Sequence, residues 1–328
     1  MVPSTRTSGA FDKPRNTALP KRPVAPRTRI FTALPVRELW HHATCLVDVV
    51  KQLVALLDAR VIDQHRAVNA LENEQAARGL FAPEVSSRLT VVEDIENPQQ
   101  LERLLETAGP DVVVNCIAVG RPAPADPMRS VAVYSVLPQR LSQLCRRSGT
   151  RLVQISSDGV FSGLRGGYTE DDLPDANDVY GVSKLLGEVT GPHAITLRTS
   201  IIGHELQSGS GLLEWFLSQQ DRCSAYTRAI FSGFPTIVLA DLIRDVVIRR
   251  PDLHGIYHVA TRPISKFDLL RLVAERYGKK IELIADDRAS PDRSLVADRF
   301  ERATGYVAPD WPTLVDVMYC DRFGSART

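Results

Sequence analysis

The sequence predicts an α/β protein with a doubly wound parallel sheet and a smaller mixed α/β lobe. Two observations indicate this fold class. Segments rich in β-branched and apolar residues alternate with segments of helical periodicity between residues 88 and 261. In addition, residues 111–118 form an apolar run without polar alternation, as a parallel strand requires when helices cover both faces of its sheet. Together these patterns are typical of a Rossmann-type sheet.

Each predicted element has a local signal. Residues 88–94 are rich in β-branched side chains, which favours a strand. Asn97 followed by Pro98 predicts the start of a helix, and Ser265 predicts the start of another. Further strands are expected at residues 60–63, 151–156, 194–200 and 255–260, and further helices at residues 49–57, 137–145, 212–217 and 240–247.

Composition narrows the classes of partner. The 328-residue chain carries a net charge of +1, which gives no argument for a nucleic-acid partner. It has no apolar run near the ~20 residues that a membrane helix needs. Its five cysteines are scattered without a Cys-x-x-Cys pair, which suits reduced thiols in the cytoplasm. His254 and His258 have helical spacing but fall on a predicted strand, so we expect no metal site.

Composition also divides the chain into three parts. Residues 1–43 are basic and rich in proline, so we expect a disordered or aberrant leader. Residues 44–202, joined by 236–261, are expected to form the nucleotide-binding core. Residues 203–328 are expected to form most of the substrate-binding lobe.

Tyr180 and Lys184 form the pair with the clearest chemical meaning. Four residues apart on a helix, they lie on the same face. A nearby ammonium lowers the pKa of a phenol. A phenol tuned in this way, beside the hydroxyl of Ser157, can protonate a carbonyl oxygen as hydride reaches its carbon. The Tyr-x-x-x-Lys spacing alone is a weak signal, because it also arises by chance.

Four segments together resemble the extended short-chain dehydrogenase/reductase family, in its dTDP-4-dehydrorhamnose reductase branch. They are residues 155–163, 171–188, 231–236 and 255–260. The resemblance extends over residues 85–320. It implies that NADPH or NADH reduces a nucleotide-activated 4-keto sugar, and it allows a homodimer.

The resemblance also implies the roles of individual residues. The catalytic group comprises Ser157, Tyr180 and Lys184. The cofactor-binding set comprises Asp63, Arg66, Asp94, Ala118, Val119, Gly120, Tyr180 and Lys184. The substrate-binding set comprises Asp158, Arg198, Thr199 and Arg293. Asp63 would favour the ribose hydroxyls of NAD, whereas Arg66 would favour the 2′-phosphate of NADP.

The opening of the chain departs from this family. The family has a Gly-x-x-Gly-x-x-Gly turn that holds the cofactor diphosphate at a helix N-terminus. The only glycines before residue 110 are Gly9, Gly79 and Gly109. Three explanations remain open: a shifted reading frame before about residue 45, loss of dinucleotide binding, or an unusual cofactor loop.

Two further departures lie near the predicted site. Tyr134 follows Val133 where the family often has an asparagine, which can hold a proton-relay water in related enzymes. Gly159 follows Asp158 where the branch usually has tyrosine. Because the glycine-rich turn is missing, a non-enzymatic sugar-nucleotide-binding or regulatory subunit is an alternative function, and a sugar-nucleotide epimerase or dehydratase is another.

Overall fold

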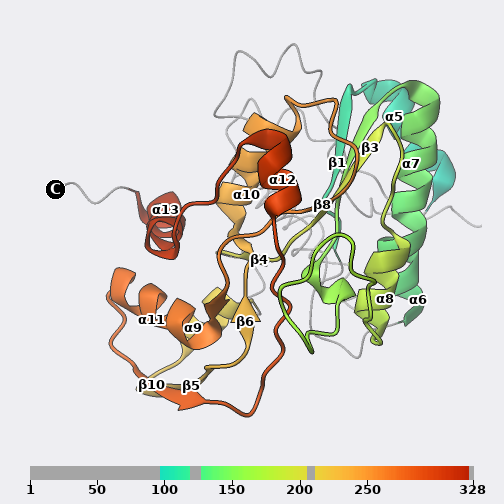
Figure 1. The fold of residues 1–328 in the computed structure, drawn as a ribbon. Helices are drawn as coiled ribbons and strands as arrows, with labels where there is room; N and C mark the ends of the chain where they lie inside the picture. The colour runs from blue at the N-terminus through green and yellow to red at the C-terminus, as the bar shows by residue number, and fades with distance from the viewer. Residues whose placement is uncertain (1–96, 119–126, 205–210, 325–328) are drawn as a thin grey trace, which may run out of the picture.

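The computed structural model describes residues 97–118, 127–204 and 211–324 (Figure 1). The predicted leader, the helix at 49–57 and the strands at 60–63 and 88–94 lie outside these residues. From residue 97 onward the predicted elements can be compared with the structure.

The centre of the molecule is a four-stranded parallel sheet. Val112 pairs with Arg151, Leu152 with Ala194, and Ile195 with Gly255. The predicted doubly wound α/β class is confirmed, since helices connect these parallel strands. The strands, in spatial order, are β1 (Val112–Asn115), β2 (Arg151–Ile155), β3 (Ala194–Arg198) and β8 (Gly255–His258).

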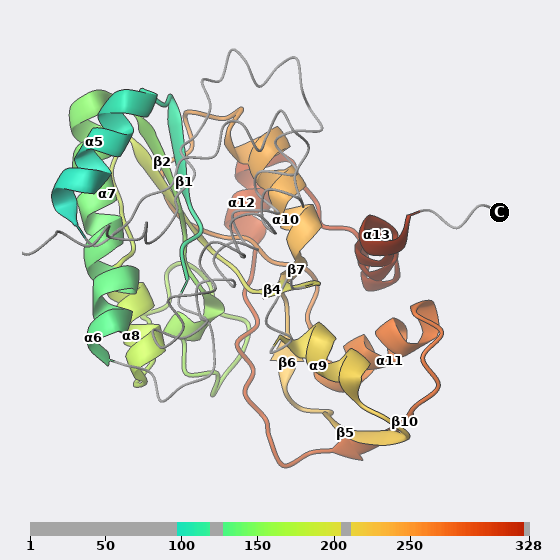
Figure 2. The ribbon, with the colours of Figure 1, turned by 180° about the vertical axis from the view of Figure 1, so that it is seen from behind.

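Helices cover both faces of this sheet (Figures 1 and 2). On one face, Val113 and Leu152 pack in a core cluster with Leu101 and Leu141, which come from two helices. On the other face, Val153 packs in a second cluster. Burying one such side chain contributes about 1.5–3 kcal/mol. Apolar packing on both sides explains why the strands lack polar alternation. The first face carries α5 (Pro98–Ala108) and α7 (Leu137–Ser148), and the second carries α10 (Thr236–Leu242) and α12 (Asp298–Thr304).

Local signals fix several helix ends. The Asn97 side chain accepts hydrogen bonds from the backbone N–H groups of Gln99 and Gln100, as its capping role predicts. Gly109 ends the same helix in the left-handed region, with φ 51°. Before α7, the chain forms one continuous helical run of α6 (Pro127–Val131) and the π-helical turn η2 (Ala132–Val136).

The second lobe mixes short strands and helices. Ser265 caps the helix α11 (Lys266–Arg276), because its Oγ accepts the N–H of Asp268. Strands β5 (Arg222–Tyr226) and β10 (Glu282–Asp286) pair in parallel and lie at the far end of the molecule from the main sheet (Figure 2). The helical elements are α9 (Leu212–Ser218), η4 (Ile243–Val247), α11 (Lys266–Arg276) and α13 (Trp311–Phe323). The strands are β4 (Ile201–Ile202), β5 (Arg222–Tyr226), β6 (Ile230–Phe231), β7 (Phe234–Pro235), β9 (Ile264–Ser265) and β10 (Glu282–Asp286).

All four strands of the main sheet end before their predicted residues, and β1 falls furthest short. β1 ends at Asn115 instead of continuing to Ala118. The Asn115 amide donates to Gln154 Oε1 at 2.7 Å, and its carbonyl oxygen accepts the N–H of Ile117 at 3.2 Å. This local turn competes with further strand pairing.

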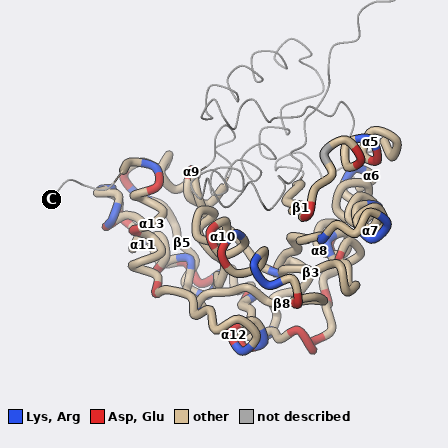
Figure 3. Tube along the Cα trace, turned by 90° about the horizontal axis from the view of Figure 1, so that it is seen from above, with Lys and Arg blue, Asp and Glu red and all other residues tan. Residues whose placement is uncertain are grey.

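The charged residues are interspersed in sign along the described elements (Figure 3). This distribution agrees with the net charge of +1. In the described part of the chain, no helix is both long enough and apolar enough to cross a membrane.

Candidate active site

Ser157 lies just beyond the carboxyl end of β2. It caps the short 3-10 helix η3 (Asp158–Val160): its Oγ accepts the N–H of Gly159 at 3.0 Å. The same hydroxyl donates to Asp158 Oδ1 at 3.2 Å. Ligands in doubly wound sheets bind beyond the carboxyl ends of the strands. Ser157 therefore lies where the fold places a reactant.

Helix α8 (Val179–Leu186) is packed closely against this turn. Asp178 caps the helix by accepting the N–H of Gly181 at 2.8 Å. A methyl group on Gly181 would overlap the carbonyl oxygen of Gly159, and one on Gly187 would overlap the carbonyl oxygen of Tyr134. Glycine at both positions allows α8 to approach these two backbones directly.

Tyr180 and Ser157 meet at Gly159. A Cβ atom on Gly159 would lie 2.8 Å from Cε1 of Tyr180 and 3.1 Å from Oγ of Ser157. The phenol ring and the serine hydroxyl thus border the same small space, although 23 residues separate them in sequence. The structure brings these two predicted residues together.

Lys184 lies one helical turn after Tyr180 and is buried, with 7% of its surface exposed. Its Nζ donates to the carbonyl oxygen of Ile155 at 3.1 Å, two residues before Ser157. Burial lowers the pKa of Lys184 to about 8, and the nearby Cys116 and Glu188 oppose that shift. Ser157, Tyr180 and Lys184 therefore gather at the carboxyl end of one strand.

The charges of two cationic side chains, Arg293 and Lys266, act on Asp158. Burial raises the pKa of its carboxyl group, while hydrogen bonds from Ser157 and Ser200 and the charges of Arg293 and Lys266 oppose that rise. The Arg293 guanidinium also lies 4.0 Å from the Asp178 carboxylate. Among the described residues, no acceptor meets the buried Nε of Arg293.

Two more residues belong to the rim at the carboxyl ends of the strands. Thr199 was predicted to bind substrate, whereas Lys266 was not among the predicted site residues. The Thr199 carbonyl oxygen accepts the N–H of Asp158 at 3.1 Å, which joins β3 to the turn that holds Ser157. Lys266 opens α11 directly after the capping Ser265. The sequence offered one signal for Lys266: it is one of only seven lysines, and it directly follows the predicted helix cap Ser265.

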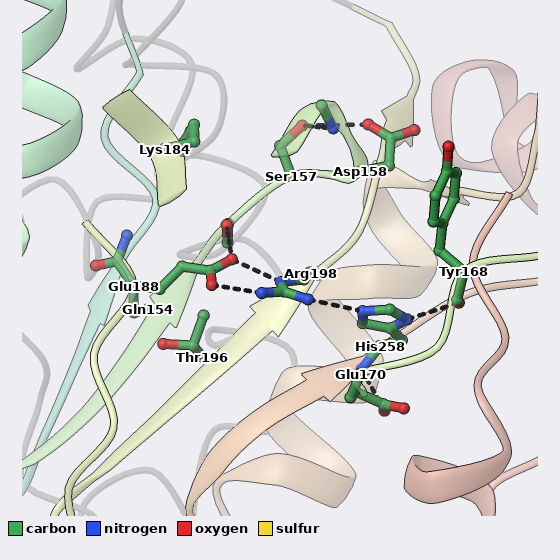
Figure 4. A network of polar contacts seen from close by, with 12 residues as sticks. Gln154, Ser157, Asp158, Tyr168, Glu170, Lys184, Glu188, Thr196, Arg198 and His258 are labelled. Atoms are coloured by element: carbon green, nitrogen blue, oxygen red, sulfur yellow. Dashed lines mark hydrogen bonds and ion pairs between the residues drawn. The ribbon is translucent and has the colours of Figure 1, made fainter. Parts of the chain in front are cut away.

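Arg198, predicted to bind substrate, has internal partners instead (Figure 4). It is buried in β3, and its Nε and one terminal nitrogen each donate to the Glu188 carboxylate at 2.7 Å. Its other terminal nitrogen lies 3.3 Å from Nε2 of His258. Ser156 Oγ adds a third hydrogen bond to Glu188 at 2.8 Å. Each nitrogen of Arg198 thus already has a protein partner below the rim.

His258 completes this network in the neutral state. Its Nδ1 lies 3.0 Å from the carbonyl oxygen of Tyr168. A carbonyl can only accept, so Nδ1 carries the proton and Nε2 accepts from Arg198. Burial first, and then the charge of Arg198, lower the pKa of His258 to about 4. Figure 4 shows the network running from Glu188 through Arg198 to His258 and Tyr168.

The structure describes Ala118, Tyr180 and Lys184 of the predicted cofactor-binding set. Asp63, Arg66, Asp94, Val119 and Gly120 lie outside the described residues. Ala118 closes the described segment after β1 and is partly exposed. Within the described ranges, no group of three or more His, Cys, Asp or Glu side chains is arranged to hold a metal ion.

Known proteins resemble this chain over most of its length. The sequence profile of the RmlD substrate binding domain family matches residues 52–314. A dTDP-4-dehydrorhamnose reductase of Mycobacterium tuberculosis is 36% identical over 118 residues, or 33% of this chain and 38% of that protein. Methionine adenosyltransferase 2 subunit beta of Xenopus tropicalis is 25% identical over 200 residues, or 54% of this chain and 58% of that protein. The chain thus spans less than two thirds of the length of both relatives.

A solved structure shows the same fold. The dTDP-4-dehydrorhamnose reductase from Bacillus anthracis, solved in complex with NADP, aligns with a TM-score of 0.62 at 19% identity. The alignment covers 70% of this chain and 85% of that chain.

Proposed function

We propose that this chain, which belongs to the RmlD substrate binding domain family, is an NADPH- or NADH-dependent reductase of a nucleotide-activated 4-keto sugar. One observation carries the proposal: Tyr180 and Ser157 border one space at Gly159, with Lys184 one helical turn away. That group provides a proton donor, a hydrogen-bond donor and a buried cation for carbonyl reduction.

The described side of the cofactor site fits a nicotinamide nucleotide by its donors. The Lys184 ammonium and the Tyr180 phenol can each donate to ribose hydroxyls. Ala118 follows the carboxyl end of the neighbouring strand β1, where ligands bind in sheets of this kind. The bound dihydronicotinamide supplies hydride to the carbonyl carbon. We propose Asp63, Arg66, Asp94, Val119 and Gly120 as the remaining contacts of the whole dinucleotide.

The described residues divide the proton chemistry among them. Tyr180 gives its proton to the carbonyl oxygen of the sugar. Ser157 exchanges its bond to Asp158 for a bond to that same oxygen, and so stabilises the charge that develops there. Lys184 is mostly charged at pH 7, because its pKa stays about one unit above that pH. Its charge favours the phenolate that remains on Tyr180.

The substrate's diphosphate would bind at the cationic part of the rim. Arg293 offers an Nε without an acceptor among the described residues, and the charge of Lys266 acts on the same carboxylate, Asp158. A guanidinium fork suits phosphate oxygens. We therefore assign Arg293, Lys266, Asp158 and Thr199 to the substrate side and leave Arg198 to the internal network.

The proposal also assigns the two lobes, the location and the assembly of the chain. We propose that residues 44–202 with 236–261 hold the cofactor, and that most of residues 203–328 cover the nucleotide sugar. The described cysteines, Cys116, Cys145, Cys223 and Cys320, are free thiols, which suits a cytoplasmic location. We propose a homodimer as the assembly.

Titration of the purified chain with NADPH, followed by addition of a dTDP-4-keto-6-deoxy sugar, tests this function. We expect saturable nicotinamide fluorescence and oxidation of NADPH that depends on the sugar. No NADPH binding together with retained sugar-nucleotide binding would favour the non-enzymatic subunit instead. Co-purified NAD with isomerised or dehydrated sugar and no net oxidation would favour an epimerase or dehydratase.

A further inference from the structure

Tyr134 contacts both Lys184 and Tyr180. The Lys184 Nζ lies 4.8 Å from the centroid of the Tyr134 ring. The Tyr180 ring meets the same ring edge to face, with centroids 5.3 Å apart and planes at 87°. Tyr134 is itself only 4% exposed. One aromatic ring therefore contacts both the cation and the phenol.

The backbone of Tyr134 is held against the catalytic helix from two sides. It lies at the centre of the π-helical turn η2, a kind of irregularity that often marks functional sites. The next residue, Ser135, donates from Oγ to the carbonyl oxygen of Ser183 at 2.8 Å. Gly187 approaches the Tyr134 carbonyl so closely that a methyl group would overlap it. These contacts fix where the ring can stand relative to α8.

We propose that Tyr134 is a positioning residue, whose ring holds the Lys184 ammonium and the Tyr180 phenol at their working separation and stabilises the ammonium through its face. The catalytic part of this inference rests on the proposed function. The electrostatic part does not, because it concerns two side chains that are in place without ligand.

The electrostatic part follows from the surroundings of Lys184. Its ammonium has lost most of its water, and one carbonyl oxygen, that of Ile155, accepts a hydrogen bond from it. An aromatic face attracts a cation, and more strongly when the cation is desolvated. The ring of Tyr134 thus supports the charged state that burial opposes.

Other titratable groups also face Lys184. Cys116 approaches from the end of β1, but burial raises the pKa of its thiol to about 12, so it is neutral near pH 8. Glu188 follows α8 and shares its charge with Arg198. Tyr180 lies on the same helix. All three groups are kept in every Tyr134 variant, and Tyr180 is the one of them that also packs on the Tyr134 ring.

The test measures the pKa of Lys184 by NMR titration of ¹³C-lysine in the full chain without ligands. The chain has seven lysines, and a Lys184→Gln variant identifies the signal. We expect Tyr134→Phe to keep the wild-type pKa, since it retains the ring. We expect Tyr134→Leu to lower that pKa by about one unit, a tenfold change in the ionisation constant.

Two further variants keep the test decisive. Tyr134→Met also lacks an aromatic face, but its unbranched side chain adapts better to irregular gaps, so it replaces Tyr134→Leu if the latter fails to fold. Tyr319→Leu is the matched control, because it removes a ring that lies 3.8 Å from a different cation, Arg276. An unchanged Lys184 pKa in a folded Tyr134→Leu or Tyr134→Met chain would overturn the proposal.

A second readout applies if the chain reduces keto sugars. The alkaline limb of the pH profile of kcat that reports Lys184 should then move to lower pH in Tyr134→Leu by the same amount and stay in place in Tyr134→Phe. Failure of the wild-type chain to bind NADPH would contradict the proposed function. The pKa of Lys184 in the ligand-free chain would still test the role of Tyr134. The two failures are therefore distinguishable.

Discussion

Tyr180 packs its phenol ring directly on Gly159, where a Cβ atom would lie 2.8 Å from Cε1 of the ring. Real Cβ atoms do not approach carbon that closely, so any side chain at this position must displace the ring. The absence of a side chain at position 159 therefore sets where the phenol stands. The same space gives the ring access to Ser157 Oγ.

Gly159→Ala tests this relationship. We expect kcat to fall about 10–100-fold, because a catalytic group displaced by about 1 Å loses much of its effect. The KM for NADPH should change little, since Lys184 keeps its place. Steady-state kinetics on the folded variant check both values. In a Tyr180→Phe background the Gly159→Ala change should cost no further activity; a full additional loss would show that Gly159 acts through something other than Tyr180.

Glu188→Gln tests the buried ion pair with Arg198. The variant keeps the shape of the side chain but leaves a buried guanidinium without its counter-charge. We expect unfolding free energy to fall by about 3–5 kcal/mol, measured by urea denaturation. Asp298→Asn is the matched control, because its pair with Arg302 is largely exposed and should change stability by less than about 1 kcal/mol. Equal effects of the two variants would contradict the role given to the buried pair.

His258 should make stability depend on pH. Its pKa is about 4 in the folded chain and 6.5 when unperturbed, so the unfolded chain binds more protons between these values. Stability from this group is therefore complete above pH 6.5 and is lost as pH falls towards 4, by about 3 kcal/mol in total. Unfolding free energies at several pH values check this.

Two histidine variants separate this contribution from the others. His258→Asn should flatten the dependence between pH 6.5 and 4, whatever its effect on absolute stability. His254→Gln should leave the dependence as it is, because His254 is exposed. An unchanged slope in His258→Asn would show that this imidazole is not the responsible group.

Arg293→Gln tests the diphosphate contact. Loss of a charged fork should raise the KM for the nucleotide sugar about tenfold or more, and leave the KM for NADPH nearly unchanged. Arg302→Gln, on the neighbouring α12, removes an exposed arginine and serves as the control. If both variants keep the wild-type KM for the sugar nucleotide, Arg293 does not bind the substrate.

Local patterns were sufficient for much of the fold. The caps at Asn97 and Ser265 and the apolar runs of β2 and β3 stand close to where the sequence predicts them, because capping and strand formation depend on adjacent residues. The end of β1 was wrong by three residues, since the turn at Asn115 depends on Gln154 in the next strand. Such a contact between distant residues leaves no signal in a short window.

The site was harder to predict for the same reason. The spacing of Tyr180 and Lys184 was readable, because both lie on one helix. The assignment of Arg198 to substrate could not account for Glu188 and His258, which reach it from other elements. Lys266 joins the rim from the second lobe, and only the folded chain brings its charge near Asp158. The sequence showed that Tyr134 departs from the family pattern, but it could not show that the Tyr134 ring contacts Lys184 and Tyr180.

The central claim is that Tyr180 delivers a proton while hydride reaches a sugar carbonyl. Deuterium transfer tests it most directly: NADPH carrying deuterium at either face of C4 is incubated with a dTDP-4-keto-6-deoxy sugar, and the product is analysed by mass spectrometry. We expect one of the two labelled cofactors to place one deuterium on the former carbonyl carbon. Tyr180→Phe should reduce that transfer about 10²–10⁴-fold while still binding NADPH, and the control Tyr226→Phe, at an exposed position, should not. NADPH binding without any deuterium transfer, or transfer that survives in Tyr180→Phe, would contradict the account.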